Sequence, residues 1–96
     1  MHREIILKNP GEKLVKIELD IEDEKIISVC ISGDFFFYPE GSIKNLESAI
    51  LGPIRNVPER IKEFFKTNNI EMLGISEDTI IKGIEGALKE KHEEQR

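Results

Sequence analysis

The chain has 96 residues, of which 39% are hydrophobic and 34% charged, and its formal net charge is −5. This length suits one domain over residues 1–96, and an acidic balance without a basic stripe argues against nucleic acid as a partner. Because no apolar run approaches the ~20 residues of a membrane span, we expect a cytoplasmic protein without a membrane partner.

The first part of the chain has the patterns of β-strands. A short apolar run over residues 5–7 ends at the turn signal Asn-Pro-Gly over residues 9–11. Residues 15–21 then alternate strictly between apolar and charged side chains, which is typical of a strand with one packed face. After a charged connection over residues 22–25 the alternation resumes over residues 26–31, so a hairpin is predicted. In the second strand the side chains expected to share a face are Ile27, Val29 and Ile31.

Beyond residue 40 the apolar spacing becomes helical. Ser42 is the expected N-cap of a helix over residues 43–51, which a Gly-Pro pair then ends. Asn56 and Glu59 have the spacing of a capping box at the start of a second helix, and this helix is expected to end at Asn68.

The last part of the chain contains a short extended segment and a third helix. Residues 70–75 indicate a linker or an edge strand, and Ser76 is the expected cap of a helix that extends to Leu88. The tail over residues 89–96 is charged on all sides. Strands followed by helices predict an α+β fold, with an antiparallel sheet of about three strands and about three helices packed on one face.

Residues suited to catalysis or metal binding are few. His2 and His92 lie near opposite ends of the chain, where we expect solvated side chains without neighbours for a metal site or a triad. Cys30, the only cysteine, excludes an internal disulfide and is expected to be buried within its strand. Glycine-rich phosphate-binding patterns are absent from the sequence. We therefore predict no catalytic residue and no metal ligand in this chain.

The loop over residues 9–13 presents a lysine directly before a strand. Lys13 can be a solvated side chain on an ordinary turn. It can also be a lysine at the rim of an active site that faces a phosphate or a carboxylate. The residues alone leave both interpretations open.

Four consecutive aromatic residues follow Asp34, and the glycine before it indicates a bend or bulge. Asp34 is placed to hydrogen-bond the backbone of that turn. If the strand continues, Phe35 and Phe37 face one way, and Phe36 and Tyr38 face the other. A sheet covered on one face buries only one of these pairs. The other pair is expected to form an exposed apolar patch, which usually marks an interface.

Ordered motifs run through residues 10–52, PGEKLVKIELDIEDEKIISVCISGDFFFYPEGSIKNLESAILG, and continue in residues 73–84, LGISEDTIIKGI. Over about residues 8–88 the chain resembles the accessory domain of lipoate–protein ligases. That family has a proline-glycine loop with a lysine, a Gly-Asp-Phe-Phe element before a proline, a helix with a Leu-Glu pair that closes on glycine, and a Gly-Ile-Ser segment that opens the last helix. Glu12 departs from this pattern, because a glycine is expected there. The matching residues of the first three motifs are Pro10, Gly11, Lys13, Gly33, Asp34, Phe35, Phe36, Pro39, Leu46, Glu47 and Gly52.

The resemblance implies that this chain is the separate small subunit of a bipartite lipoate–protein ligase and is not catalytic alone. In that family lipoate and ATP give lipoyl-AMP and pyrophosphate, and a lysine of a lipoyl-domain acceptor protein then takes the lipoyl group. The large subunit is implied to hold lipoate, ATP and Mg²⁺, so we expect no cofactor bound by this chain alone. Asp34, Phe36 and Tyr38 are the expected contacts to the large subunit, and Lys13 is the candidate at the substrate rim.

Two alternatives remain open. One is a stand-alone interaction module that forms a homodimer through the aromatic patch. The other is an iron–sulfur scaffold or sulfur-transfer adaptor, because the family's accessory fold is similar to such proteins. That role requires several cysteines, or one exposed nucleophilic cysteine on a loop.

Overall fold

An antiparallel sheet of four strands forms one layer of the fold in the computed structural model, which describes residues 1–89. Strands β1 (His2–Leu7), β2 (Val15–Glu22) and β3 (Lys25–Gly33) pair in chain order. The two-residue strand β5 (Gly52–Pro53), which the sequence analysis did not anticipate, extends the sheet beside β3.

The pairing of β2 with β3 differs from the prediction in two places. Asp23 and Glu24 alone form the turn, with φ angles of 52° and 60°, and such left-handed pairs match the twist of a two-residue hairpin. The register shifts after Asp20, so that Ile27 is an extra residue in a β-bulge. Ile26 therefore faces the core, at 1% exposed, whereas Ile27 is 50% exposed. The prediction that Ile27 shares a face with Val29 and Ile31 is thus wrong, because the bulge places Ile26 in the core instead.

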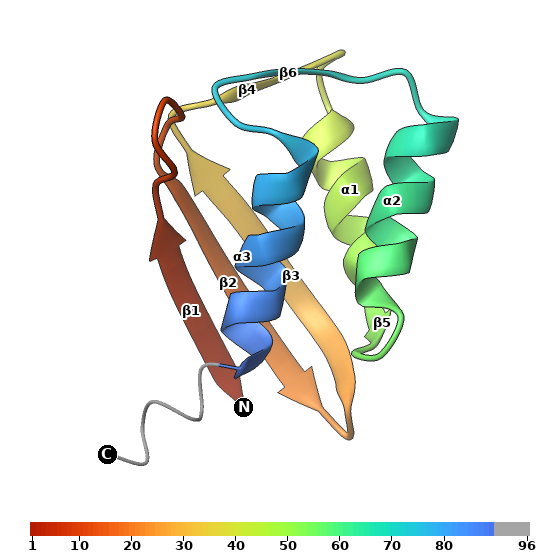
Figure 1. The fold of residues 1–96 in the computed structure, drawn as a ribbon. Helices are drawn as coiled ribbons and strands as arrows, with labels where there is room; N and C mark the ends of the chain where they lie inside the picture. Colours follow the sequence, from red (N-terminus) through yellow and green to blue (C-terminus); the bar gives the residue numbers. More distant parts are fainter. Residues whose placement is uncertain (90–96) are drawn as a thin grey trace.

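Three helices, α1 (Ser42–Ile50), α2 (Val57–Thr67) and α3 (Glu77–Lys89), cover one face of this sheet, and the other face is open (Figure 1). The α+β class, with an antiparallel sheet and helices on one face, is therefore confirmed. No helix in the part of the chain that the structure describes is long and apolar enough to cross a membrane. His92 and the tail beyond Lys89 lie outside the described residues.

The predicted end of α2 at Asn68 and its N-cap position at Asn56 are confirmed, but an N-cap with a side-chain hydrogen bond forms only in α3. Gly41 and Asn56 are the N-caps of α1 and α2, both in the left-handed conformation and without a side-chain hydrogen bond. Ser42 is instead the first helical residue, and the predicted capping box of α2 does not form. In α3 the backbone N–H of Thr79 donates to the Ser76 hydroxyl at 3.3 Å, which confirms Ser76 as its cap.

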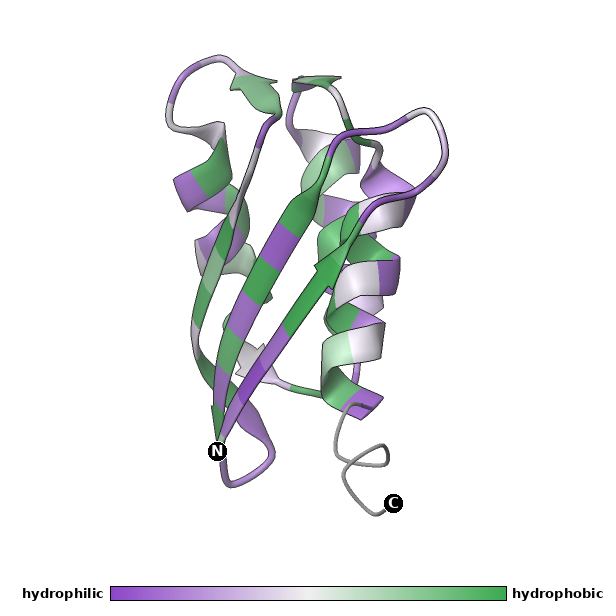
Figure 2. Ribbon diagram, turned by 90° about the vertical axis from the view of Figure 1, so that its left-hand side faces the viewer, coloured by the Kyte–Doolittle hydropathy of each residue, from purple (hydrophilic) through white to green (hydrophobic). Residues whose placement is uncertain are grey.

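The hydrophobic core lies between the sheet and the helices. Figure 2 shows the alternation of apolar and polar residues as green and purple bands along the strands. The apolar side chains of the inner face meet the apolar stripes of the helices and are withdrawn from water, which supplies the main stabilising term of the fold. The fully buried apolar residues are Val15, Ile17, Leu19, Leu46, Ile50, Val57, Ile61, Ile80, Ile84 and Ala87.

A second sheet of two strands, β4 (Phe36–Tyr38) and β6 (Glu71–Leu73), crosses one end of the molecule, at the top of Figure 1. It confirms the predicted edge strand within residues 70–75. The predicted bend lies at Gly33, where φ is 152° and a Cβ atom would lie 2.2 Å from the Leu14 carbonyl oxygen. Only glycine fits this approach, and the chain leaves the first sheet here.

Candidate docking surface

The ribbon formed by β4 and β6 presents three large apolar side chains to solvent. In its register Phe36 pairs with Leu73 and Tyr38 pairs with Glu71, so these side chains share one face. Phe36, Tyr38 and Leu73 are 73%, 66% and 64% exposed. We refer to these three residues as the docking face. Exposed apolar groups gathered in this way mark interaction sites, unlike singly scattered ones.

The inner face of the ribbon packs against the core. Phe37 pairs with Met72 across the ribbon, and both are half-buried. The Phe37 ring centroid lies 5.6 Å from that of Phe35 and 6.3 Å from that of Phe65, distances typical of favourable aromatic pairs. The predicted division of the four aromatic residues between core and solvent is therefore confirmed.

Backbone contacts hold the ribbon against the loop that precedes β2. The Lys13 N–H donates to the Gly74 carbonyl at 2.7 Å, and the Asp34 N–H donates to the Leu14 carbonyl at 3.4 Å. Gly74 has a φ of 104°, and a Cβ atom there would lie 3.1 Å from the Cβ of Phe35. The loop and the ends of both ribbon strands are therefore in direct contact, so the docking face rests on a fixed base.

Side chains tie the same loop to the start of α3. The buried Thr79 hydroxyl donates to the Glu12 carboxylate and accepts a hydrogen bond from the Asn9 side-chain amide at 3.0 Å. Glu12, which departs from the family pattern, therefore has a definite structural role here. A single hydroxyl joins two residues of the loop to one helix.

Lys13 and Asp34 lie at the same end of the molecule as the docking face, and both side chains are exposed. The Lys13 ammonium and the Asp34 carboxylate make no hydrogen bond or ion pair within residues 1–89. The predicted bond from the Asp34 carboxylate to the backbone of the turn does not form, and the backbone N–H of Asp34 donates to the Leu14 carbonyl. Both charges are thus available to an external group.

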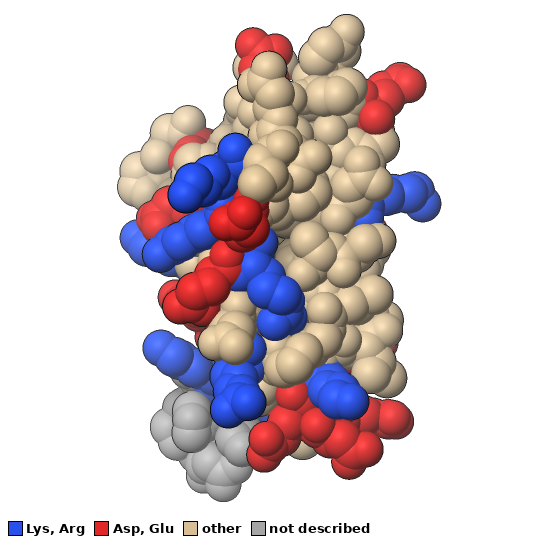
Figure 3. Space-filling model, turned by 90° about the vertical axis from the view of Figure 1, so that its right-hand side faces the viewer, with Lys and Arg blue, Asp and Glu red and all other residues tan. Residues whose placement is uncertain are grey.

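The side of the molecule that carries α1 and α2 is divided by charge. Figure 3 shows acidic and basic side chains mixed over one half of this side, whereas a largely uncharged surface runs down the other half from the end of the molecule that holds the ribbon. In a chain that is 34% charged, such a surface is unusual. This uncharged surface reaches the end of the molecule that holds the ribbon.

A hollow of about 600 Å³ lies between α1 and α2, but its lining does not suit an anionic substrate. Its basic residue, Arg60, already donates to the carbonyls of Ala49 and Ile50 at 3.1 and 2.7 Å. Glu59 and Glu63 add negative charge to the same lining. Arg60 caps the end of α1, and the hollow offers an anion no uncommitted cation.

Two residues outside this surface lie in surroundings that the sequence did not predict. Cys30 is exposed rather than buried, because it pairs with Glu18 on the open face of the sheet. It lies on a strand and not on a loop. His2 belongs to β1, and its Nδ1 lies 2.9 Å from the Asp20 carboxylate. Glu4 and Glu18 also lie beside His2, so the expectation that it lacks neighbours is wrong.

Leu73 is the member of the docking face that sequence reasoning missed. The alternation of Glu71, Met72 and Leu73 is the only local signal, and it is three residues long. Its importance follows from pairing with Phe36, 37 positions earlier in the numbering. Such a long-range pairing between two short strands leaves no periodic pattern in the sequence.

The comparisons with known proteins agree on one kind of relative. No protein-family model matches the sequence. A stretch of 53 residues is 38% identical to lipoate-protein ligase A subunit 2 of Thermoplasma acidophilum and covers 54% of this chain and 56% of that protein. The match therefore spans about half the length of that curated relative.

A solved structure gives a likeness over more of the chain. It describes an archaeal lipoylation system from Thermoplasma acidophilum, a bipartite lipoate protein ligase and its E2 lipoyl domain. One of its chains superposes with a TM-score of 0.74 at 28% identity, over 88% of this chain and 97% of that chain.

The fold is that of a small α+β domain with an exposed apolar ribbon at one end. The two likenesses confirm the resemblance drawn from the motifs, which is to the accessory domain of lipoate–protein ligases in the form of a separate small subunit.

Proposed function

We propose that this chain is the small subunit of a bipartite lipoate–protein ligase and that it forms a heterodimer with the catalytic large subunit through the docking face. The observation that carries this proposal is the exposure of three large apolar side chains on a ribbon fixed to the core. Burying apolar surface is favourable by roughly 25 cal/mol per Å², so a partner that covers the ribbon gains affinity. The likeness to a small subunit favours the large subunit as that partner.

Charged residues beside the ribbon have proposed roles at the edge of the same contact. The Asp34 carboxylate pairs with a basic group of the large subunit, since rim charges steer partners into register. Lys13, which follows the anchored Glu12, reaches toward the substrate site of the large subunit. A backbone held by Gly74 and a free ammonium suit a positioning role there.

The proposed activity of the heterodimer is the ATP-dependent lipoylation of protein. The large subunit holds lipoate, ATP and Mg²⁺, and it forms lipoyl-AMP with release of pyrophosphate. This chain supports that first step by closing the site and excluding water, because a dry site strengthens the electrostatic interactions that stabilise charge in the reaction. A lysine of a lipoyl-domain acceptor protein then takes the lipoyl group, a step that depends less on this chain.

Size-exclusion chromatography of this chain mixed with the large subunit tests the interface. We expect co-elution for the wild-type chain and its loss for Leu73→Asp, because the substitution places a charge within the docking face. Ile27→Asp is the matched control, since Ile27 is also exposed but lies on β3 at the bulge. Co-elution of Leu73→Asp at wild-type levels would contradict the proposed interface.

The same measurement separates the stand-alone interaction module from the proposed function. That alternative predicts a homodimer that dissociates in the Leu73→Asp variant. It also predicts that the chain does not bind the large subunit. The proposed function predicts a heterodimer at equimolar mixing.

A further inference from the structure

The open face of the sheet carries polar side chains in cross-strand rows. His2 of β1 lies opposite Asp20 of β2, and Glu4 lies opposite Glu18. Because the helices pack on the other face, these rows are accessible to solvent. They contain an imidazole and three carboxylates from neighbouring strands, which are donor groups for metal ions.

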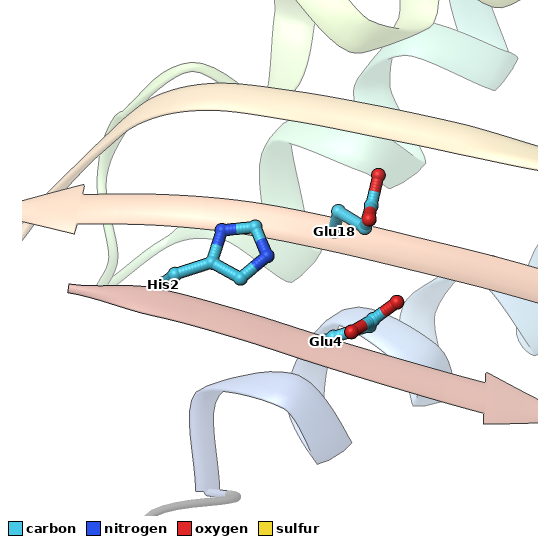
Figure 4. Close-up of side chains that lie close together, drawn as sticks. All are labelled: His2, Glu4 and Glu18. Carbon is cyan, nitrogen blue, oxygen red and sulfur yellow. The ribbon is translucent and has the colours of Figure 1, made fainter.

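The orientation of His2 is set by a carboxylate behind it. Nδ1 of His2 lies 2.9 Å from one oxygen of Asp20, and the Ser28 hydroxyl donates to the other oxygen at 2.7 Å. With Nδ1 protonated and donating to Asp20, the lone pair of the neutral ring is on Nε2. Figure 4 shows that the ring nitrogen remote from the backbone points toward Glu4 and Glu18. A histidine held by a carboxylate in this way is the usual arrangement behind a metal-binding imidazole.

The donor atoms of His2, Glu4 and Glu18 are close enough to share one ion. They lie within 4.8 Å of one another. A cation is already held between the two carboxylates, because the Lys16 ammonium lies 3.0 Å from Glu4 and 3.7 Å from Glu18. This ammonium belongs to a flexible, partly exposed side chain and can be displaced into solvent. The two carboxylates that hold this ammonium therefore also suit a metal cation that accepts the His2 imidazole as a nitrogen ligand.

We propose that Nε2 of His2 and the carboxylates of Glu4 and Glu18 bind a divalent transition metal ion such as Zn²⁺, which displaces the Lys16 ammonium. One imidazole and two carboxylates are a donor set for Zn²⁺ or Co²⁺, whereas Mg²⁺ prefers oxygen ligands alone. The ion would join β1 to β2 near the end of the sheet and would leave a coordination position for water. The inference does not rest on the proposed function.

Calorimetric titration of the full chain, purified without a histidine tag, tests the site with Zn²⁺ and with Mg²⁺. We expect saturable binding of one Zn²⁺, a rise in the unfolding temperature with Zn²⁺, and no comparable binding of Mg²⁺. His2→Gln should lower the Zn²⁺ affinity at least ~10-fold, and Asp20→Asn should lower it ~10–100-fold through loss of the group that orients the ring. Lys16→Met should raise the affinity, because it removes the competing ammonium.

Two matched variants make the result decisive. His92→Gln removes the other histidine of the chain and Cys30→Ser removes the thiol opposite Glu18, and both should bind Zn²⁺ like the wild type. Absence of saturable Zn²⁺ binding, unchanged affinity in His2→Gln, or loss of binding in His92→Gln or Cys30→Ser would each overturn the site. Binding of Mg²⁺ as tight as that of Zn²⁺ would equally exclude a role for the imidazole.

Discussion

The four consecutive aromatic residues should respond differently to substitution, because adjacent side chains point to opposite faces. Phe36→Ala should weaken binding of the large subunit and leave the free energy of unfolding nearly unchanged, since the ring is 73% exposed. Phe35→Ala should cost about 3–5 kcal/mol of stability, as is usual when a buried phenylalanine is truncated. Chemical denaturation and a binding titration measure the two effects. Equal loss of stability in both variants would contradict the assignment of faces.

Lys13 is expected to act on one step of the reaction. Lys13→Ala should slow formation of lipoyl-AMP more than it slows transfer from preformed lipoyl-AMP, because the ammonium is free to face the reacting anions of the first step. Single-turnover assays of the two half-reactions measure this. Lys62→Ala, an exposed lysine of α2, is the control and should change neither step. Equal slowing of both steps by Lys13→Ala would place Lys13 outside the substrate rim.

His2 should titrate at a higher pH than an ordinary histidine. The hydrogen bond to the Asp20 carboxylate raises the pKa of His2, so the protonated ring persists to higher pH in the folded chain than in the unfolded one. Any stability from this pair is present below the pKa of the unfolded state and fades as the pH rises through the folded pKa. Asp20→Asn should lower the pKa of His2, as measured by NMR titration in metal-free buffer. An unchanged pKa would mean that the two side chains do not pair in solution.

At the scale of elements, the hydrogen bonds of Thr79 that join loop 9–13 to α3 can be tested directly. Thr79→Val keeps the shape of a buried side chain but leaves Glu12 and Asn9 without their shared hydroxyl. Loss of a buried hydrogen-bonding partner typically costs about 1–3 kcal/mol. Denaturant unfolding should show this loss for Thr79→Val and a change within about 0.5 kcal/mol for the exposed Thr67→Val. Similar values for the two variants would show that these hydrogen bonds add little to the free energy of unfolding.

The long elements could be predicted from sequence because their patterns are periodic. Alternation over residues 15–21 and helical spacing after residue 40 gave the sheet and the three helices. The bulge at Ile27 could not be found in this way, since Ile26 and Ile27 are both apolar and either can face the core. The caps of α1 and α2 rest on left-handed backbone at Gly41 and Asn56 rather than on side-chain oxygens.

At the scale of the whole molecule, only part of the candidate surface could be predicted from the sequence. Phe36 and Tyr38 could be placed together on an exposed face, because successive side chains of a strand point to opposite faces. Leu73 joins them through a contact between strands far apart in the sequence, and the ring of Phe65 closes over Phe37 from α2. Tertiary contacts of this kind determine which exposed side chains form one continuous surface.

The proposed division of labour between this chain and a large subunit also belongs to this scale. The hollow beside Arg60 offers an anion no uncommitted cation, while the docking face rests on a clamped base. Under the proposed function, this chain contributes by covering the site of the large subunit. Its effect on catalysis should therefore depend on contact and not on a reacting side chain of its own.

Pyrophosphate release from ATP and lipoate by the large subunit, measured with and without this chain, is the most direct test. We expect rapid release only when the wild-type chain is present, and intermediate release with Phe36→Ala that rises toward the wild-type rate as more of the variant is added. Release by the large subunit alone at the full rate would contradict a supporting role for this chain in adenylation.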